Sequence, residues 1–532
     1  MMKLLSRSSG IDFRVMTWIA VLVAIPAFWI NLDNVAVIDD EGIRAQVALE
    51  MIYSGDYIVP RLFGEYYYKK PPLFNWILAG FFKLTGNDTE WTTRSVTLIF
   101  LAIYTWFIFY FFKTEWGTKL AWWTAFATLT CGRILFWDSM LGLIDITFSL
   151  VVFISFMLMF QYREKGLIKK LYLSTYLLTA IGFMLKALPA IAFQGMSLIA
   201  TWADVRKWRP FFHPWHFIAG FMCLGLLGIY YILYAQSGDL LVLFPVLLFE
   251  SSQRTPVHYG IWESILHLFE FPLEMLYHFF PWSLFILLLL VRGNLRRVWS
   301  DPFARFLSLI FLFNIWLYWI SPEVYPRYLL MLAPLYFGVG LFMYQKHEDK
   351  YDLVARIVRW FFVGIAVLAS VACVIGLVMI PEVRTLSFWW IKGMFVISVM
   401  VLITIFMIRS KLFTIPGMVL LLLVFRLGFS LFVLPLREDD QHASITRDDA
   451  LRIGEKYKGQ DLRVEETTFL NPSTGYYLTR SYGAVIPKFK GDITNDAVYI
   501  VDPEFYKGSE YRLVDSMRIP QHKKTVHIGK KK

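Results

Sequence analysis

Long apolar segments constrain this chain more than any other feature of its sequence. Runs of about twenty residues recur from Val15 to Leu434, and each is long enough to cross a bilayer as a helix. Hydrophobic residues make up 57% of the 532 positions and charged residues only 17%, which is typical of a polytopic membrane protein. We therefore expect about thirteen transmembrane helices, at roughly 15–32, 95–112, 120–136, 143–160, 171–185, 188–203, 215–235, 278–291, 303–320, 328–344, 359–380, 386–408 and 414–434.

The charges between these segments predict the topology. The N-terminus and every second loop are basic, so the positive-inside rule places them in the cytoplasm. The net charge of +11 then belongs to cytoplasmic loops and does not indicate nucleic-acid binding. No small-residue cleavage site follows the first span, which we expect to remain a transmembrane helix. Segments 39–94, 236–277 and 321–327 and the tail after Leu434 are placed on the outer face.

The first outer segment has two helical patterns. Ile43, Val47 and Met51 recur at helical spacing, and a second helix is expected to start at the Pro71-Pro72 pair and run through Phe82. We expect both helices to lie in the plane of the membrane interface, where they would hold a lipid head group beside neighbouring acids.

The tail is polar and predicts a small α/β domain outside the membrane. Strands are expected at 462–465, 497–501 and 511–514, a helix at 448–458, and turns at Asn471-Pro472 and Thr474-Gly475. The run 530–532 is expected to be a solvated end. We therefore divide the chain into a membrane domain, 1–436, which includes the juxtamembrane helices of 39–94, and a periplasmic domain, 437–532.

Neither cysteines nor histidines predict a metal or disulfide framework. Cys131, Cys223 and Cys373 all fall inside predicted spans, without metal-type spacing. The loop with Gln253, Arg254, His258, Glu263 and His267 lacks tight ligand spacing, so a divalent metal there is possible in principle but is not supported. We expect no cofactor.

Two acids are candidates for catalysis. Asp40 follows the first span, beside Asp39 and Glu41, where a general base could take a proton from a nucleophile. Asp145 lies at the outer start of the fourth span, and ionisable residues at such depth are costly and often functional. The competing interpretation of both acids is capping of the helices that follow them.

Several cations on the same face are candidates for binding a phosphate. Lys70, Lys69 and Arg327 are the main ones, because a lysine offers a point charge and an arginine a bidentate fork. Lys186 is a weaker candidate, and Arg44 and Glu41 are possible support. Snorkelling of long side chains toward the interface is the alternative interpretation. Acids and cations together predict group transfer from a lipid-linked phosphate donor.

These residues resemble a known family. The densest match lies within residues 39–76, and the matching segments are Asp40-Glu41-Gly42, Ser54-Gly55-Asp56-Tyr57-Ile58-Val59-Pro60, Lys70-Pro71-Pro72, Leu143-Ile144-Asp145-Ile146-Thr147, Leu185-Lys186-Ala187 and Tyr325-Pro326-Arg327-Tyr328. They are similar to the bacterial aminoarabinose transferase and protein O-mannosyltransferase-like group of GT-C glycosyltransferases. The expected spans and outer domain also look like that group, so the resemblance covers essentially the whole chain.

The resemblance implies a GT-C fold, a polyprenyl-phosphate sugar donor and transfer on the periplasmic face of the bacterial inner membrane. The acceptor would be lipid A, another glycan or a protein. Asp40 corresponds to the family's catalytic aspartate, Asp145 to its second acidic position, and Lys70 to the lysine that contacts the donor phosphate. The reaction expected is an inverting displacement at the anomeric carbon.

The chain departs from the aminoarabinose branch of this group at positions associated there with a metal. Lys69 stands where that branch has an acid, and Gln253 stands in place of a histidine. Ile43 replaces an expected arginine, although Arg44 is adjacent. These departures argue against a metal and put aminoarabinose and lipid A in doubt as donor sugar and acceptor.

Two rival functions remain open from the sequence. A flippase for lipid-linked sugars predicts polar residues in several mid-membrane spans, whereas the ionisable residues here gather at one face. A glycan ligase with a diphosphate-linked donor is distinguished from a monophosphate enzyme by the resemblance alone.

Overall fold

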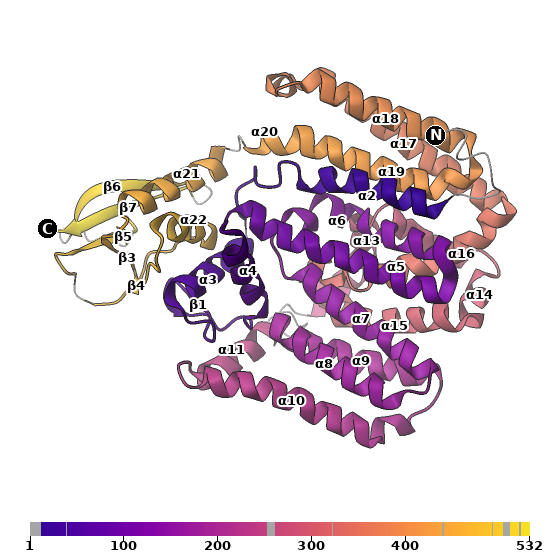
Figure 1. Ribbon diagram of the computed structural model, residues 1–532, viewed down its shortest axis with the longest axis horizontal. Coiled ribbons are helices and arrows are strands. Elements are labelled where there is room, and N and C mark those ends of the chain that lie inside the picture. Colours follow the sequence, from indigo (N-terminus) through magenta and orange to yellow (C-terminus); the bar gives the residue numbers. More distant parts are fainter. Residues whose placement is uncertain are drawn as a thin grey trace.

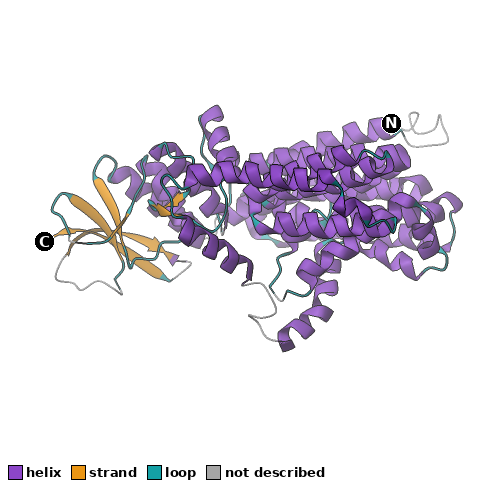
Figure 2. Ribbon diagram, turned by 90° about the horizontal axis from the view of Figure 1, so that it is seen from below, coloured by secondary structure: helices purple, strands orange, loops and turns teal. Residues whose placement is uncertain are grey.

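A bundle of long helices forms one end of the molecule and a small sheet domain forms the other (Figures 1 and 2). The computed structural model describes residues 12–38, 40–252, 261–321, 323–438, 441–491, 493–503, 511–520 and 523–532. The predicted fold class, a helical membrane protein with a C-terminal α/β domain, is confirmed.

The bundle is built from the apolar segments of the sequence. Its helices are α2 (Phe13–Trp29), α5 (Glu90–Leu129), α6 (Gly132–Phe136), α7 (Asp145–Glu164), α8 (Ile168–Lys186), α9 (Leu188–Asp204), α10 (Pro214–Tyr234), α13 (Ile261–His278), α14 (Asn294–Ser300), α15 (Pro302–Trp319), α16 (Ala333–Lys350), α17 (Leu353–Met379), α18 (Trp389–Arg409) and α19 (Thr414–Gly428). Short 3₁₀ helices join some of them: η1 (Asp138–Met140), η2 (Arg209–Phe212), η3 (Trp282–Leu290), η4 (Pro326–Leu329), η5 (Pro381–Thr385) and η6 (Lys411–Phe413). A π-helical turn, η7 (Phe429–Val433), and α20 (Leu434–Glu438) continue α19.

Every one of the predicted spans is at least partly helical, but fewer helices meet a strict criterion for crossing a membrane. Among the described residues, seven helices are both long and apolar enough. One of these runs from Glu90 to Phe136 and holds two predicted spans, 95–112 and 120–136, which the non-helical backbone of Gly117 (φ +77°) separates. Others, such as α9, are short and packed inside the bundle, where neighbouring helices rather than lipid cover them. Hydropathy therefore predicted the positions of the apolar helical segments more closely than the number of helices that meet this criterion.

A layer of short elements lies between the bundle and the sheet domain (Figure 1). It contains α3 (Asp40–Ser54), α4 (Leu73–Thr85), the two-residue strands β1 (Arg61–Leu62) and β2 (Glu65–Tyr66), and α11 (Leu240–Ser252). The helices expected in the first outer segment are both present. Most residues of α3 are buried, because α22 of the sheet domain and α4 pack against it.

The sheet domain is a mixed five-stranded sheet with two helices. Its elements are α21 (Gln441–Lys456), β3 (Asp461–Glu465), α22 (Pro472–Tyr482), β4 (Lys488–Phe489), β5 (Ala497–Val501), β6 (Tyr511–Ile519) and β7 (Lys524–Lys531). The strand order is β4-β3-β5-β7-β6, with β3 parallel to β4 and β5, and β7 antiparallel to β5 and β6.

Both turns expected in the tail were wrong, because α22 also contains Thr474 and Gly475. Asn471 and Pro472 begin α22 instead of a turn: the side chain of Asn471 caps the helix by accepting a hydrogen bond from the backbone N–H of Ser473. At the end of the chain Lys531 and Lys532 are exposed, as expected, but Lys530 pairs with both β5 and β6, and Lys531 pairs with β6. The backbone can pair here while the long side chains reach outward, which a charge pattern does not reveal.

The segments that the charge pattern placed on one face lie together at one end of the bundle. Lys69 forms an ion pair with Glu250 of α11, Tyr66 donates to the carbonyl of Ser237, and Arg327 reaches Asp40. The sheet domain lies at this same end, and the chain's N-terminus lies at the far end of the bundle (Figure 2). We call this end the site end.

Candidate active site

Four charged side chains of alternating sign form a row at the site end, and we call it the charge row. Nη2 of Arg327 lies 3.2 Å from Oδ2 of Asp40, and Nε of Arg327 lies 3.6 Å from Oδ2 of Asp145. The other carboxylate oxygen of Asp145 accepts from Nζ of Lys186 at 2.5 Å. The row thus brings together residues that are far apart in the sequence, and Lys186 belongs to it as the end member opposite Asp40.

Solvent reaches only one end of the charge row. Asp145, Lys186 and Arg327 are almost fully buried, whereas the side chain of Asp40 is 51% exposed. Burial alone would lower the pKa of Arg327, but the carboxylates of Asp145 and Asp40 outweigh it and raise that pKa above its ordinary value. Arg327 therefore stays charged, and Asp40 is the acid that a molecule entering from outside can touch.

Helix ends place these charges where the backbone favours them. Asp40 begins α3 and Asp145 begins α7, and acids are stabilised at helix N-termini by the exposed N–H groups. Lys186 ends α8, where a cation is stabilised by the free carbonyls. Asp145 does not cap α7, since Ile144 is its N-cap and no side-chain cap bond forms, so the two acids act as first-turn charges and not as caps.

Two tyrosines of η4 and its approach support the cations. The guanidinium carbon of Arg327 lies 4.4 Å from the ring centre of Tyr325, and Nζ of Lys186 lies 3.9 Å from that of Tyr328. Such contacts hold a cation over an aromatic face and stabilise it where water is scarce. Sequence reasoning had not assigned these tyrosines a role, although both flank the Pro326-Arg327 pair.

A cavity of about 230 Å³ opens beside Lys186. Its polar lining includes Lys69, Lys70, Lys186 and Glu250, together with Tyr318, Ser321 and Tyr328. Nζ of Lys69 lies 3.2 Å from Oε1 of Glu250. Three ammonium groups and one carboxylate line the cavity, so its charge suits an anion such as a phosphate. The sequence signal for Glu250, which we had missed, is a lone acid near the end of an apolar helix.

Glu41 and Arg44 lie apart from this cavity. Glu41 is fully buried, pairs with Arg94 at 2.8 Å, and accepts from the backbone N–H of Gly142. Arg44 donates to the hydroxyl of Tyr67 at 2.7 Å. Both side chains connect α3 to its neighbours, and their contacts are structural.

A second buried ion pair lies close to the charge row. Arg133 contacts both carboxylate oxygens of Asp138 at 3.0 Å, and burial raises the pKa of Asp138 to about 6 although Arg133 opposes the rise. The charges of Asp145 and Arg327 also act on Asp138.

The residues that the structure describes do not offer a metal site. No group of three His, Cys, Asp or Glu side chains comes close enough to bind an ion among them. Position 69, which carries an acid in the aminoarabinose branch, holds a lysine that pairs with Glu250. Gln253, Arg254 and His258 of the histidine-containing loop lie outside the described residues, whereas Glu263 and His267 lie in α13.

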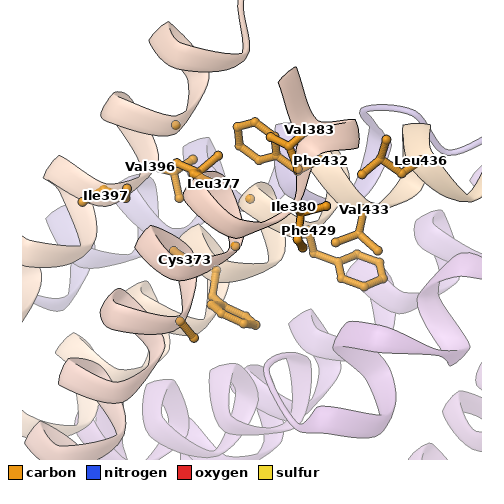
Figure 3. A pocket seen from close by; sticks show the side chains of 15 residues that line it. Cys373, Leu377, Ile380, Val383, Val396, Ile397, Phe429, Phe432, Val433 and Leu436 are labelled. Atoms are coloured by element: carbon orange, nitrogen blue, oxygen red, sulfur yellow. The ribbon is translucent and has the colours of Figure 1, made fainter. Parts of the chain in front are cut away.

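A different hollow has the wrong chemistry for the reaction. It measures about 190 Å³, lies between α17, α18 and the α19 segment, and is lined by apolar side chains (Figure 3). Cys373, Val396 and Phe429 are among them. No side chain that lines it is charged, so it is not a candidate for binding a phosphate.

Known proteins are similar to part of the chain in sequence and to the whole chain in fold. Residues 69–231 match the family described as dolichyl-phosphate-mannose-protein mannosyltransferase. None of the curated protein sequences matches the chain significantly. Among solved structures, ArnT from Cupriavidus metallidurans bound to undecaprenyl phosphate is similar, with 18% identity, a TM-score of 0.68 and coverage of 96% of this chain and 97% of that one.

The same ArnT in its apo state is also similar, with 17% identity, a TM-score of 0.63 and the same coverage of both chains. At such identity the likeness establishes the fold, which is therefore the expected GT-C fold of a multi-pass membrane protein. Part of the chain thus matches a mannosyltransferase family, and the whole chain has the fold of the two ArnT structures.

Proposed function

We propose that the chain transfers a sugar from a polyprenyl-phosphate donor to a lipid, glycan or protein acceptor, on the periplasmic face of the bacterial inner membrane. The observation that carries this proposal is the placement of the charge row against the cavity lined by Lys69 and Lys70. One wall of that cavity supplies cations for a phosphate, and the row ends in an acid open to solvent.

The reaction is a single displacement with inversion at the anomeric carbon. The acceptor hydroxyl or amine forms a bond to that carbon while the bond from carbon to phosphate oxygen breaks. The carboxylate of Asp40 takes the acceptor's proton, and the electron pair of the broken bond stays on the departing polyprenyl phosphate. That leaving group is an ionised phosphate, so it needs charge stabilisation more than it needs a general acid.

Lys70, Lys69 and Arg327 hold the donor phosphate in this proposal. Arg327 contacts Asp40 in the structure, and a phosphate entering the cavity competes with that carboxylate for the same guanidinium. Such an exchange would bring the leaving group to Arg327 and leave Asp40 free to take a proton. Asp145 and Lys186 hold Arg327 in place from its other side.

An apolar groove supports the assignment of a lipid-linked donor. It measures about 250 Å³, lies between α13, α15 and α16, and is lined by Trp319, Leu329 and other apolar residues. Leu329 is two residues from Arg327, so a polyprenyl chain in the groove would carry its phosphate toward the cations. The similar ArnT structure was solved with undecaprenyl phosphate, which is a lipid of this class.

The charge pattern supports the periplasmic side. The basic loops alternate with the segments that meet at the site end, which favours a cytoplasmic N-terminus and a periplasmic sheet domain, 437–532. A compartment without ATP requires a donor that is already activated, and a sugar on a lipid phosphate meets that requirement.

The test uses purified protein in lipid, supplied with a panel of polyprenyl-phosphate sugars and a pooled membrane extract as the source of acceptor. Release of free polyprenyl phosphate is followed for the native chain, for Asp40→Asn and for Asp33→Asn, an exposed acid outside the site. We expect release that requires extract and is abolished by Asp40→Asn alone. Undiminished release by Asp40→Asn would remove that residue from the mechanism, and movement of lipid-linked sugar between leaflets without release would favour a flippase.

A further inference from the structure

The backbone that leads into Asp40 is held on one side by the bundle. Arg94, at the start of α5, is almost fully buried and donates to the carbonyls of Leu32, Val35 and Ala36 at 2.7, 2.8 and 3.3 Å. It also forms the two-pronged ion pair with Glu41. The guanidinium of Arg94 thus fixes three carbonyl groups of segment 32–36 and the side chain of Glu41, the residue after Asp40.

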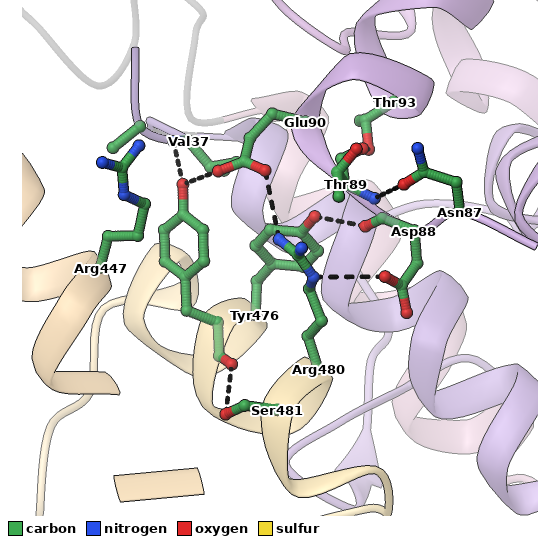
Figure 4. Close-up of polar contacts among 12 residues, drawn as sticks. Val37, Asn87, Asp88, Thr89, Glu90, Thr93, Arg447, Tyr476, Arg480 and Ser481 are labelled. Atoms are coloured by element: carbon green, nitrogen blue, oxygen red, sulfur yellow. Dashed lines mark hydrogen bonds and ion pairs between the residues drawn. The ribbon is translucent and has the colours of Figure 1, made fainter. Parts of the chain in front are cut away.

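The sheet domain holds the same segment on its other side, through Tyr477 of α22. The backbone N–H of Val37 donates to the Tyr477 hydroxyl at 2.7 Å, and that hydroxyl donates to Oε1 of Glu90 at 2.7 Å (Figure 4). Both groups are buried, and an unpaired N–H or carboxylate there would be costly. One hydroxyl therefore connects the approach to Asp40 with the start of α5.

Neighbouring contacts fasten α22 to α5 without touching this segment. Arg480 pairs with the other oxygen of Glu90 and with Asp88, both at 3.2 Å, and the Tyr476 hydroxyl donates to the carbonyl of Asp88 at 2.5 Å (Figure 4). Tyr476 and Tyr477 are thus adjacent, buried, and bonded through their hydroxyls, but the hydroxyl that bonds to residues 32–38 is that of Tyr477. Arg447 of α21 also reaches this segment and donates to the carbonyl of Asn34 at 3.5 Å.

We propose that Tyr477 is a positioning residue for the transfer reaction, and that the sheet domain sets the place of Asp40 through it. The inference rests on the proposed role of Asp40. Val37 is three residues before Asp40, and α3 begins at that aspartate, so a shift of the Val37 N–H moves the carboxylate relative to Arg327. A misplacement of about 1 Å in a reacting group costs up to about a hundredfold in rate.

The contact is suited to a constant, pH-insensitive role. Burial, followed by the charge of Glu90, raises the pKa of Tyr477 well above its ordinary value. The phenol therefore keeps its proton, which it needs in order to donate to Glu90 while it accepts from Val37. Tyr477 is not among the residues that line the cavity, so its loss should change turnover more than donor binding.

The test compares Tyr477→Phe with Tyr476→Phe in the full-length protein in lipid, with the polyprenyl-phosphate sugar that the donor panel selects. Each variant loses one buried hydroxyl from the same helix. We expect Tyr477→Phe to lower kcat about tenfold, with the KM for the donor changed by less than about twofold. Tyr476→Phe should keep kcat near that of the native chain, and thermal unfolding of both variants controls for loss of fold.

The outcomes separate this inference from the proposed function. Native kcat in Tyr477→Phe, equal losses in the two variants, or a raised KM with unchanged kcat would each overturn it. Asp40→Asn is assayed in parallel. If it is inactive while Tyr477→Phe is normal, only the inference fails; if it remains active, the role of Asp40 and the inference fail together.

Discussion

Arg327 and Asp40 meet at 3.2 Å although 287 positions separate them in the chain. The guanidinium approaches this carboxylate through Nη2 and approaches Asp145 through Nε, so two different nitrogens serve two acids. A planar fork with fixed donor directions can do this, whereas a single ammonium group cannot. The role of the guanidinium's shape at position 327 can therefore be tested separately from the role of its positive charge.

Arg327→Lys keeps the charge and removes the fork. We expect kcat/KM for the donor to fall at least about tenfold, because hydrogen bonds to charged groups contribute about 1.5–3 kcal/mol. Release of polyprenyl phosphate measures the effect. Arg384→Lys, at an exposed arginine of η5, should leave the rate unchanged. Full activity of Arg327→Lys would show that charge alone is sufficient.

Lys70→Ala should weaken donor binding more than it slows turnover. The ammonium lines the cavity, and its loss removes one charge-assisted contact to the phosphate, so we expect KM to rise about tenfold. The matched control is Lys83→Ala, an exposed lysine of α4 that is absent from the cavity lining. Binding of polyprenyl phosphate alone provides a direct readout, and equal affinities in the two variants would exclude Lys70 from the phosphate site.

Asp138 should make stability depend on pH in a defined window. Burial raises its pKa from 3.8 to about 6 in the folded protein, so the folded state binds more protons than the unfolded state between these values. This group therefore stabilises the fold most below pH about 4, and up to about 3 kcal/mol is lost as the pH rises through 6. Thermal unfolding from pH 4 to 8 measures the slope.

The control for this prediction compares how steeply the stability of the fold changes with pH, and not the stability at any one pH. Asp138→Asn leaves Arg133 without its carboxylate partner and lowers stability at every pH. It should nevertheless flatten the decline between pH 4 and 6, whereas Asp33→Asn should preserve it. An unchanged slope in Asp138→Asn would assign the dependence to other groups.

Gly42→Ala should separate α3 from α22. A Cβ atom at Gly42 would lie 2.7 Å from the backbone nitrogen of Ser473, so the two helices would have to move apart. We expect a loss of about 1–3 kcal/mol, visible as a lower unfolding temperature, together with slower transfer. Gly80→Ala on α4 has no atom within 4 Å of the new methyl group and should be neutral or stabilising. Equal unfolding temperatures in the two variants would contradict this close packing.

Much of the fold followed from patterns that depend on local sequence. Apolar runs located the bundle helices, and the spacing of Ile43, Val47 and Met51 predicted α3. Strands β3 and β5 were located within a residue. The cover of α3 by α22 was not predictable, because it depends on a close approach of Gly42 to a helix that starts at Pro472.

The site followed from sequence in its residue types and not in its pairings. Asp40, Asp145 and Arg327 stood out as charges beside apolar spans, and the structure joins them in one row. Lys186 seemed secondary because its partner, Asp145, lies at the end of another helix. Glu41 looked like part of the acidic cluster, but the helical turn directs it toward Arg94 and away from its neighbour Asp40.

The order of strands in the sheet has a consequence for biosynthesis. β7 lies between β5 and β6, yet it follows both in the chain, so the sheet stays open until β7 has left the ribosome. Val37 and Tyr477 are 440 positions apart, so the approach to Asp40 emerges long before its second support. Because long-range contacts of this kind form late, the bundle can insert before Val37 gains its contact with Tyr477. Synthesis of β7, not insertion of the bundle into the membrane, is therefore the event after which the complete sheet domain can support the approach to Asp40.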